Sequence, residues 1–176
     1  MKYINHYIKS IFIVLIVLLA ACSEKVIEPD AISMTVDEML NTPGYTWVNE
    51  VLVTYQPDTT IFNQIKELID TNRHKFVIFA RASCSCPSEK KTFAEAIKIF
   101  QDLNLPQSKY EIYAMSARTN PNPYSNIVKL NQLPEIVLFK DEVPIYYMND
   151  TLDQTIKFEK TYPITTEQLI LEALKK

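Results

Sequence analysis

Four segments of the chain space their apolar residues as an amphipathic helix does. Thr35-Val36-Asp37-Glu38 fits the capping-box pattern and predicts a short helix that ends near Asn41. Thr165 with Gln168 fits the same pattern and predicts a final helix. The other two helices are predicted over 61–69, with Asp58 or Thr59 as the N-cap, and after Pro87, with an apolar stripe at Phe93, Ala96, Ile97, Phe100 and Leu103.

Short apolar runs elsewhere predict β-strands. The run over 76–80 is continuous, which is typical of a strand buried on both faces. Strands are also predicted over 110–115, 135–139 and 144–148, and the last two are close enough to form a hairpin. The alternating segment 45–55, which contains Trp47, predicts a half-buried strand, and Asn122-Pro123 predicts the cap of a short helix through Leu130.

The order of these elements is β-α-β-α-β-α-β-β-α. Alternation of strands and helices favours an α/β fold in which a mixed central sheet is covered by helices on both faces. The sequence therefore predicts a three-layer sandwich.

The first 22 residues have the layout of an export signal. Lys2 and Lys9 precede an apolar run over 11–21, which is shorter than the roughly 20 residues of a spanning helix. Leu19-Ala20-Ala21-Cys22 resembles the lipobox of bacterial lipoproteins, and the resemblance implies cleavage before Cys22 and lipidation of its thiol. We therefore predict a signal peptide over 1–21, a lipidated N-terminus and tether over 22–34, and one domain over 35–176.

This interpretation places the domain outside the cytoplasm. The lipid on Cys22 would anchor the protein to a membrane, facing the periplasm or at the cell surface, where disulfides form and persist. The chain has a formal net charge of -3 and loses two lysines with the signal peptide, which argues against nucleic acid as a partner.

Composition excludes several kinds of chemistry. Gly44 is the only glycine, so the chain has no Gly-rich phosphate loop and no dinucleotide-binding turn. With only His6 and His74 it has no multi-histidine metal site, and His74, just before the run 76–80, is interpreted as a surface loop residue. No cofactor is expected, and the cysteines remain as the candidates for chemistry.

Cys84 and Cys86 lie in Cys84-Ser85-Cys86-Pro87, between the buried strand and the helix that Pro87 opens. Unpaired N–H groups and the helix dipole at such a position stabilise a thiolate. A second thiol two residues away makes an intramolecular disulfide possible, so the site can alternate between dithiol and disulfide.

Two segments resemble the thioredoxin-like fold family. The segment Phe76-Val77-Ile78-Phe79-Ala80-Arg81-Ala82-Ser83-Cys84 is similar to its strand ending in F-W-A-x-W-C, and Leu133-Pro134-Glu135-Ile136-Val137-Leu138-Phe139 is similar to its cis-proline strand. The resemblance covers most of 45–176. It implies a thioredoxin-like sandwich, a thiol-disulfide oxidoreductase or isomerase acting on protein thiols or disulfides, a nucleophile at Cys84, and a substrate groove formed by Leu133 and cis Pro134.

The chain also departs from that family. The second cysteine comes one position early, Ser83 replaces the tryptophan before the motif, and Ile78 stands where many members carry a buried acid. In a different alignment Cys86 is the attacking thiol, because Cys86-Pro87-Ser88-Glu89 resembles a glutaredoxin C-P-x-C without its last cysteine. The short spacing predicts a strained disulfide, with a reduction potential above the roughly -270 mV of thioredoxin.

Other functions of the cysteine pair remain open from sequence. One is a purely structural C-x-C disulfide. Another is a non-enzymatic thioredoxin-fold module that binds a protein partner or Cu(I), the latter through two soft thiolates and a methionine such as Met115 or Met148.

Overall fold

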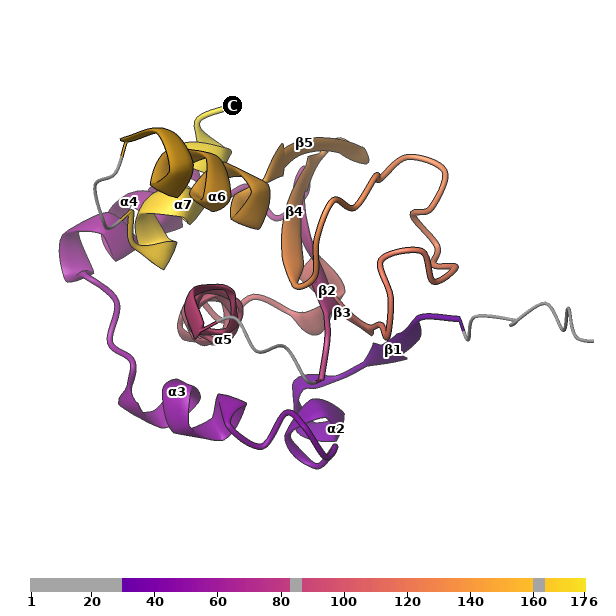
Figure 1. Cartoon of the computed structure of the whole chain (residues 1–176). Coiled ribbons are helices and arrows are strands. Elements are labelled where there is room, and N and C mark those ends of the chain that lie inside the picture. Colours follow the sequence, from indigo (N-terminus) through magenta and orange to yellow (C-terminus); the bar gives the residue numbers. More distant parts are fainter. Residues whose placement is uncertain (1–29, 83–86, 160–163) are drawn as a thin grey trace, which may run out of the picture.

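The protein is an α/β fold built on a five-stranded mixed sheet (Figure 1). The computed structural model describes residues 30–82, 87–159 and 164–176, without the side chains of 87–90 and 154–159. The strands lie in the order β1-β3-β2-β4-β5, and only the central pair β2 and β3 is parallel. Their bounds are β1 Ile32–Met34, β2 His74–Ala80, β3 Tyr110–Ala114, β4 Glu135–Lys140 and β5 Val143–Tyr147.

Six α-helices and one 3-10 turn accompany the sheet in the described part of the chain. They are α2 Val36–Leu40, α3 Val48–Thr54, α4 Thr59–Leu68, α5 Pro87–Asp102, η1 Gln107–Lys109, α6 Met148–Glu159 and α7 Thr166–Leu174. The capping boxes predicted at Thr35 and Thr165 are both formed, and Asp58 caps α4 through the backbone N–H groups of Thr60 and Ile61. These three helices therefore begin where the sequence indicates.

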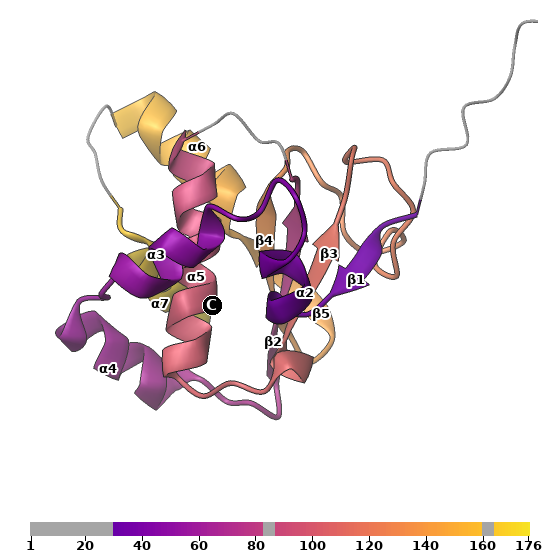
Figure 2. The same ribbon diagram turned by 90° about the horizontal axis from the view of Figure 1, so that it is seen from below.

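One face of the sheet is covered by helices. Phe76, Ile78 and Ala80 point from β2 into the main core, where they meet α5 residues such as Ile97 and Phe100. The helices α3 and α7 pack against α5, and α4 packs against α7 (Figure 2). Because β2, α5 and β3 form a parallel crossover, α5 is held directly over the centre of the sheet.

The other face is covered by an irregular segment rather than a helix. Val77 and Phe79 point into a second core, where they pack with Tyr124, Val128 and Leu130. In Figure 1 the orange segment between β3 and β4 lies on the side of the sheet away from the helices. Both faces of the sheet are covered, as predicted, but the layer over the second face is irregular rather than helical.

The helix predicted from Asn122 to Leu130 is therefore wrong. Asn122 accepts a hydrogen bond from the backbone N–H of Tyr124 through its side chain, and its own N–H donates to Ser125 Oγ. These local bonds satisfy the backbone in turns, and such bonding competes with helix formation at Asn and Ser.

The strand predicted over 45–55 is also wrong, because Val48–Thr54 forms α3. Val48 is fully buried while Val51 and Leu52 are half-buried, so the inward residues follow a helical spacing of three and four. Short apolar segments fit both the strand period of two and the helix period of 3.6 residues, and here packing against α5 favours the helix.

Two elements were not expected. Ile32–Met34, assigned to the tether, forms β1, which pairs antiparallel with β3 at the edge of the sheet. Met148–Glu159 forms α6 directly after β5.

No helix in the described residues is long and apolar enough to cross a membrane. Cys22 and the predicted signal peptide over 1–21 lie outside the described residues.

Candidate functional site

The predicted thiol pair belongs to the connection between β2 and α5. β2 ends at Ala80, α5 begins at Pro87, and the described chain between them includes Arg81 and Ala82. Cys84 and Cys86 lie outside the described residues. The described elements on either side are those predicted: a strand buried at every residue except Lys75 precedes the pair in the sequence, and a helix of 16 residues follows it.

The predicted substrate-binding residues Leu133 and Pro134 directly precede β4. The Leu133–Pro134 peptide is cis, which confirms that part of the prediction. Phe79 pairs with Glu135 in the antiparallel register of β2 and β4. Pro134, just before β4, therefore lies at the same end of the strands as Ala80, the last residue of β2. Contact between this peptide and Cys84 stays a prediction.

A groove opens at the same end of β2, on the side of β3 and β1 rather than of β4. It has a volume of about 350 Å³, and its walls include Met34, Tyr45, Ala82 and Met115. The backbone N–H of Met115 donates to the Ala80 carbonyl at 2.8 Å, which joins the ends of β2 and β3 beneath it. Burial raises the pKa of Tyr45 to about 12, so its phenol stays neutral here. The groove offers mainly apolar contacts beside Ala82.

Gly44 brings the turn after α2 against Ala82. Its φ is +94°, and a Cβ at this position would lie 3.0 Å from Ala82 Cβ and 3.1 Å from Ala82 O. Trp47 Nε1 donates to the Gly44 carbonyl at 3.0 Å, and the Trp47 ring meets Phe93 of α5 edge-on. The only glycine of the chain thus allows a close approach two residues before Cys84.

A buried carboxylate, not predicted from the sequence, fixes the start of β4. Glu135 is fully buried, and Oε1 accepts hydrogen bonds from Ile136 N at 2.9 Å and Asn149 N at 2.8 Å. Its Oε2 accepts from Asp150 N at 3.0 Å, while Asn149 Nδ2 donates to the Pro134 carbonyl at 2.7 Å. Burial raises the pKa of Glu135 to about 8 although these N–H groups favour its charged form. The signal available in the sequence was an acid directly after Leu133-Pro134, at the start of a continuous apolar run.

Glu135 and Asn149 therefore tie the Leu133–Pro134 segment to the first turn of α6. This gives the predicted groove residues a rigid support from an element that was itself not predicted.

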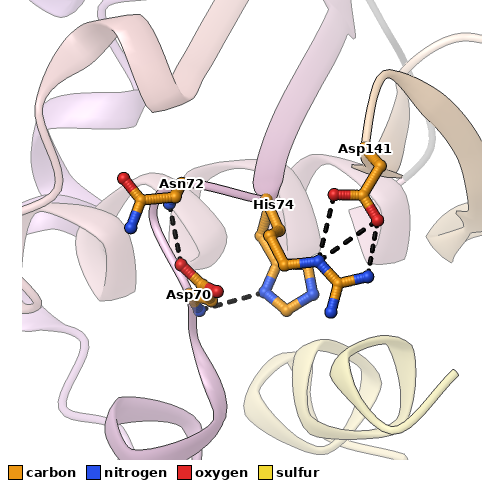
Figure 3. A network of polar contacts seen from close by, with 5 residues as sticks. Asp70, Asn72, His74 and Asp141 are labelled. Atoms are coloured by element: carbon orange, nitrogen blue, oxygen red, sulfur yellow. Dashed lines mark hydrogen bonds and ion pairs between the residues drawn. The ribbon is translucent and has the colours of Figure 1, made fainter.

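His74 lies at the opposite end of β2 and is buried, so its assignment to a surface loop is wrong. Its Nδ1 accepts a hydrogen bond from Asp70 N at 3.1 Å (Figure 3). Beside it, Arg73 Nη2 and Asp141 form an ion pair at 2.5 Å that joins the start of β2 to the β4–β5 turn. Burial, with the nearby charge of Lys140, lowers the pKa of His74. This network closes the far end of the sheet and is not part of the cysteine region.

The two candidate methionine ligands are placed differently. Met115 is buried in the second core and also borders the groove beside Ala82, at the end of β2. Met148 is fully buried in the main core. Among the described residues there is no group of three or more His, Cys, Asp or Glu side chains that could hold a metal ion.

Comparison with known proteins gave no relative. A scan against family models, a search of curated proteins and a search of solved structures found no match to this chain.

Proposed function

We propose that the protein is a membrane-tethered, extracytoplasmic thiol-disulfide oxidoreductase or isomerase with a thioredoxin-like fold, which uses Cys84 and Cys86 as its redox pair. The observation that carries the proposal is the β2–β4 register. It places the Leu133–Pro134 peptide at the end of β2, from which the chain continues to the cysteines. The sheet order, with the crossover helix α5 following the C-x-C, is a second support.

The chemistry is thiol-disulfide exchange. The Cys84 thiolate attacks one sulfur of a substrate disulfide, a mixed disulfide forms, and the other substrate sulfur leaves as a thiolate. Cys86 then attacks Cys84, so the protein becomes a disulfide and the substrate gains two electrons. In isomerisation another substrate thiolate attacks the substrate sulfur of the mixed disulfide instead. A new substrate disulfide forms, Cys84 leaves as a thiolate, and no net reductant is consumed. Net reduction requires an external dithiol that returns the pair to its reduced state.

The described elements suit this chemistry. The N-terminal end of α5 carries partial positive charge, which favours a thiolate in the residues just before Pro87. Leu133 and Pro134 bind the substrate backbone in this proposal, and the lipid on Cys22 keeps the domain at the membrane.

The test is turnover of a model disulfide peptide and of a protein with scrambled disulfides. We expect Cys84→Ser to abolish turnover, Cys86→Ser to accumulate the mixed disulfide, and the matched control Ser85→Ala to remain active. Accumulation in Cys84→Ser instead would make Cys86 the attacking thiol. Absence of turnover with every substrate would refute the oxidoreductase proposal.

A second candidate is a non-enzymatic Cu(I)-binding module, and the position of Met115 favours it. Met115, although mostly buried in the second core, borders the groove next to Ala82, and in this candidate it supplies a thioether beside the two thiolates. Stoichiometric Cu(I) uptake without turnover, lost equally in Cys84→Ser and Cys86→Ser and weakened in Met115→Leu, would support it. Unchanged uptake in Met148→Leu is the matched control.

A further inference from the structure

The segment 116–131 is long and irregular, yet it is fixed in place. Loops of more than about 12–15 residues without regular structure are uncommon in compact domains and are usually functional or disordered. Here Asn120 Oδ1 accepts from Ser116 N at 2.7 Å and Ala117 N at 2.8 Å, and Ala31 N donates to the Pro121 carbonyl at 2.8 Å. Tyr124 and Leu130 anchor the segment to the sheet. Order of this kind favours a binding loop.

The segment forms the wall of an open surface cavity of about 540 Å³. Arg118 and Lys129 are the charged residues of its described lining, which contains no acidic residue and is completed by amide, hydroxyl and apolar side chains such as Asn122, Ser125 and Val128. The volume falls within the roughly 300–1,000 Å³ typical of ligand pockets. In a chain with a net charge of -3, a cavity whose charged lining is entirely cationic selects for an anionic occupant.

Both cations keep their charge available to a ligand. Neither Arg118 nor Lys129 forms an ion pair with a described residue. Arg118 Nη1 donates to the Asn131 carbonyl at 2.9 Å, which orients the guanidinium without neutralising it. The neighbouring carboxylate of Asp150 accepts from Asn131 Nδ2 at 2.6 Å.

The cavity adjoins the candidate site on two sides. Asn120 lines both this cavity and the apolar groove beside Arg81 and Ala82. At its other end, Asn131 precedes the Leu133–Pro134 peptide by only one intervening residue. A polypeptide bound along the end of β2 would therefore reach the cavity without leaving the surface.

We propose that the cavity of segment 116–131 is a specificity pocket that binds an acidic side chain of the polypeptide substrate, near the cysteine that reacts. This inference rests on the proposed function. Arg118 and Lys129 pair with the substrate carboxylate, and the surrounding amides and hydroxyl groups bind its backbone.

The test separates binding from redox chemistry. Short synthetic peptides with serine in place of cysteine, followed either by glutamates or by glutamines, are titrated into the protein by calorimetry. We expect the glutamate peptide to bind more tightly, with the difference decreasing at high salt. Each of Arg118→Ala and Lys129→Ala should weaken binding of the glutamate peptide about two- to five-fold, as expected for ion pairs made by exposed side chains. Arg118→Lys should retain most of the affinity, and exposed Lys66→Ala on α4 is the matched control.

Equal binding of the two peptides would overturn the inference, and so would losses no larger than that of Lys66→Ala. Tighter binding of an acidic oligosaccharide than of the glutamate peptide would assign the pocket to a sugar acid and overturn it as well. Because these peptides cannot exchange disulfides, absence of turnover refutes only the proposed function.

Discussion

Replacing Glu135 by glutamine should remove a large pH dependence from the stability of this protein. Two effects oppose each other at the Glu135 carboxylate. Complete burial disfavours its charge, whereas the N–H groups of Ile136, Asn149 and Asp150 favour it. Burial prevails and raises the pKa from 4.5 to about 8. The folded protein therefore keeps this side chain protonated at a pH where the unfolded chain has released the proton.

The sign and size of the effect follow from proton linkage. For an acid whose pKa is raised by folding, stability is highest below the unfolded pKa and is lost as the pH rises toward the folded pKa. Between about pH 5 and pH 8 the wild type should lose roughly 3–4 kcal/mol relative to a variant without this titration. Glu135→Gln presents an amide NH₂ toward one backbone donor and should cost about 1–3 kcal/mol at low pH. The stability curves should converge and cross as the pH rises.

Urea unfolding of both proteins under reducing conditions, from about pH 5 to pH 8, measures this difference. Exposed Glu67→Gln on α4 is the matched control, and its curve should stay parallel to that of the wild type. If Glu135→Gln also stays parallel, the three N–H groups offset burial and the reasoning about this carboxylate is refuted.

Four further results are expected. His74→Asn should reduce acid sensitivity, because the pKa of His74 is lowered and the unfolded chain takes up a proton below about pH 6.5; equal acid midpoints in denaturation would contradict this. Gly44→Ala should cost about 1–3 kcal/mol in urea unfolding from its φ of +94° and the contact with Ala82, whereas Pro43→Ala should not. Cys22→Ser should leave the precursor uncut and unlipidated by mass spectrometry, and an unmodified N-terminus elsewhere in the wild type would count against the lipobox. Glutathione titration of Cys84 and Cys86 should give a potential above roughly -270 mV, and a value well below this would exclude the isomerase-like interpretation.

The sequence predicted elements best where local chemistry and burial agree. The capping boxes at Thr35 and Thr165 determine helix starts through side chains a few residues away, so no distant contact is needed. The run at β2 is continuous because both faces of the central strand are covered. In α3, by contrast, Val48 and its neighbours fit either period, and only the presence of α5 selects the helix.

The site was only partly accessible from sequence for a similar reason. The cis Leu133–Pro134 peptide belongs to a local motif and was predicted. Burial of Glu135 depends on the first turn of α6, and burial of His74 depends on the packing around the start of β2. The spacing of residues along the sequence carries no information about such distant partners. The burial of Glu135 and of His74 therefore could not be predicted from the sequence.

The segment between β3 and β4 covers one face of the sheet with turns, where the sequence predicts a helix. A helix over 122–130 would satisfy most backbone groups within itself and present one apolar face to the sheet. The turns found there use Asn120, Asn122 and Ser125 to fix the backbone, so the segment can bury Tyr124 and still line an open cavity. The same covering layer thereby stabilises the second face of the sheet, ends at the Leu133–Pro134 peptide, and holds Arg118 and Lys129 beside it. A regular helix could provide the first of these features but would not leave an open pocket with both exposed cations on its wall, and the proposed specificity pocket depends on that arrangement.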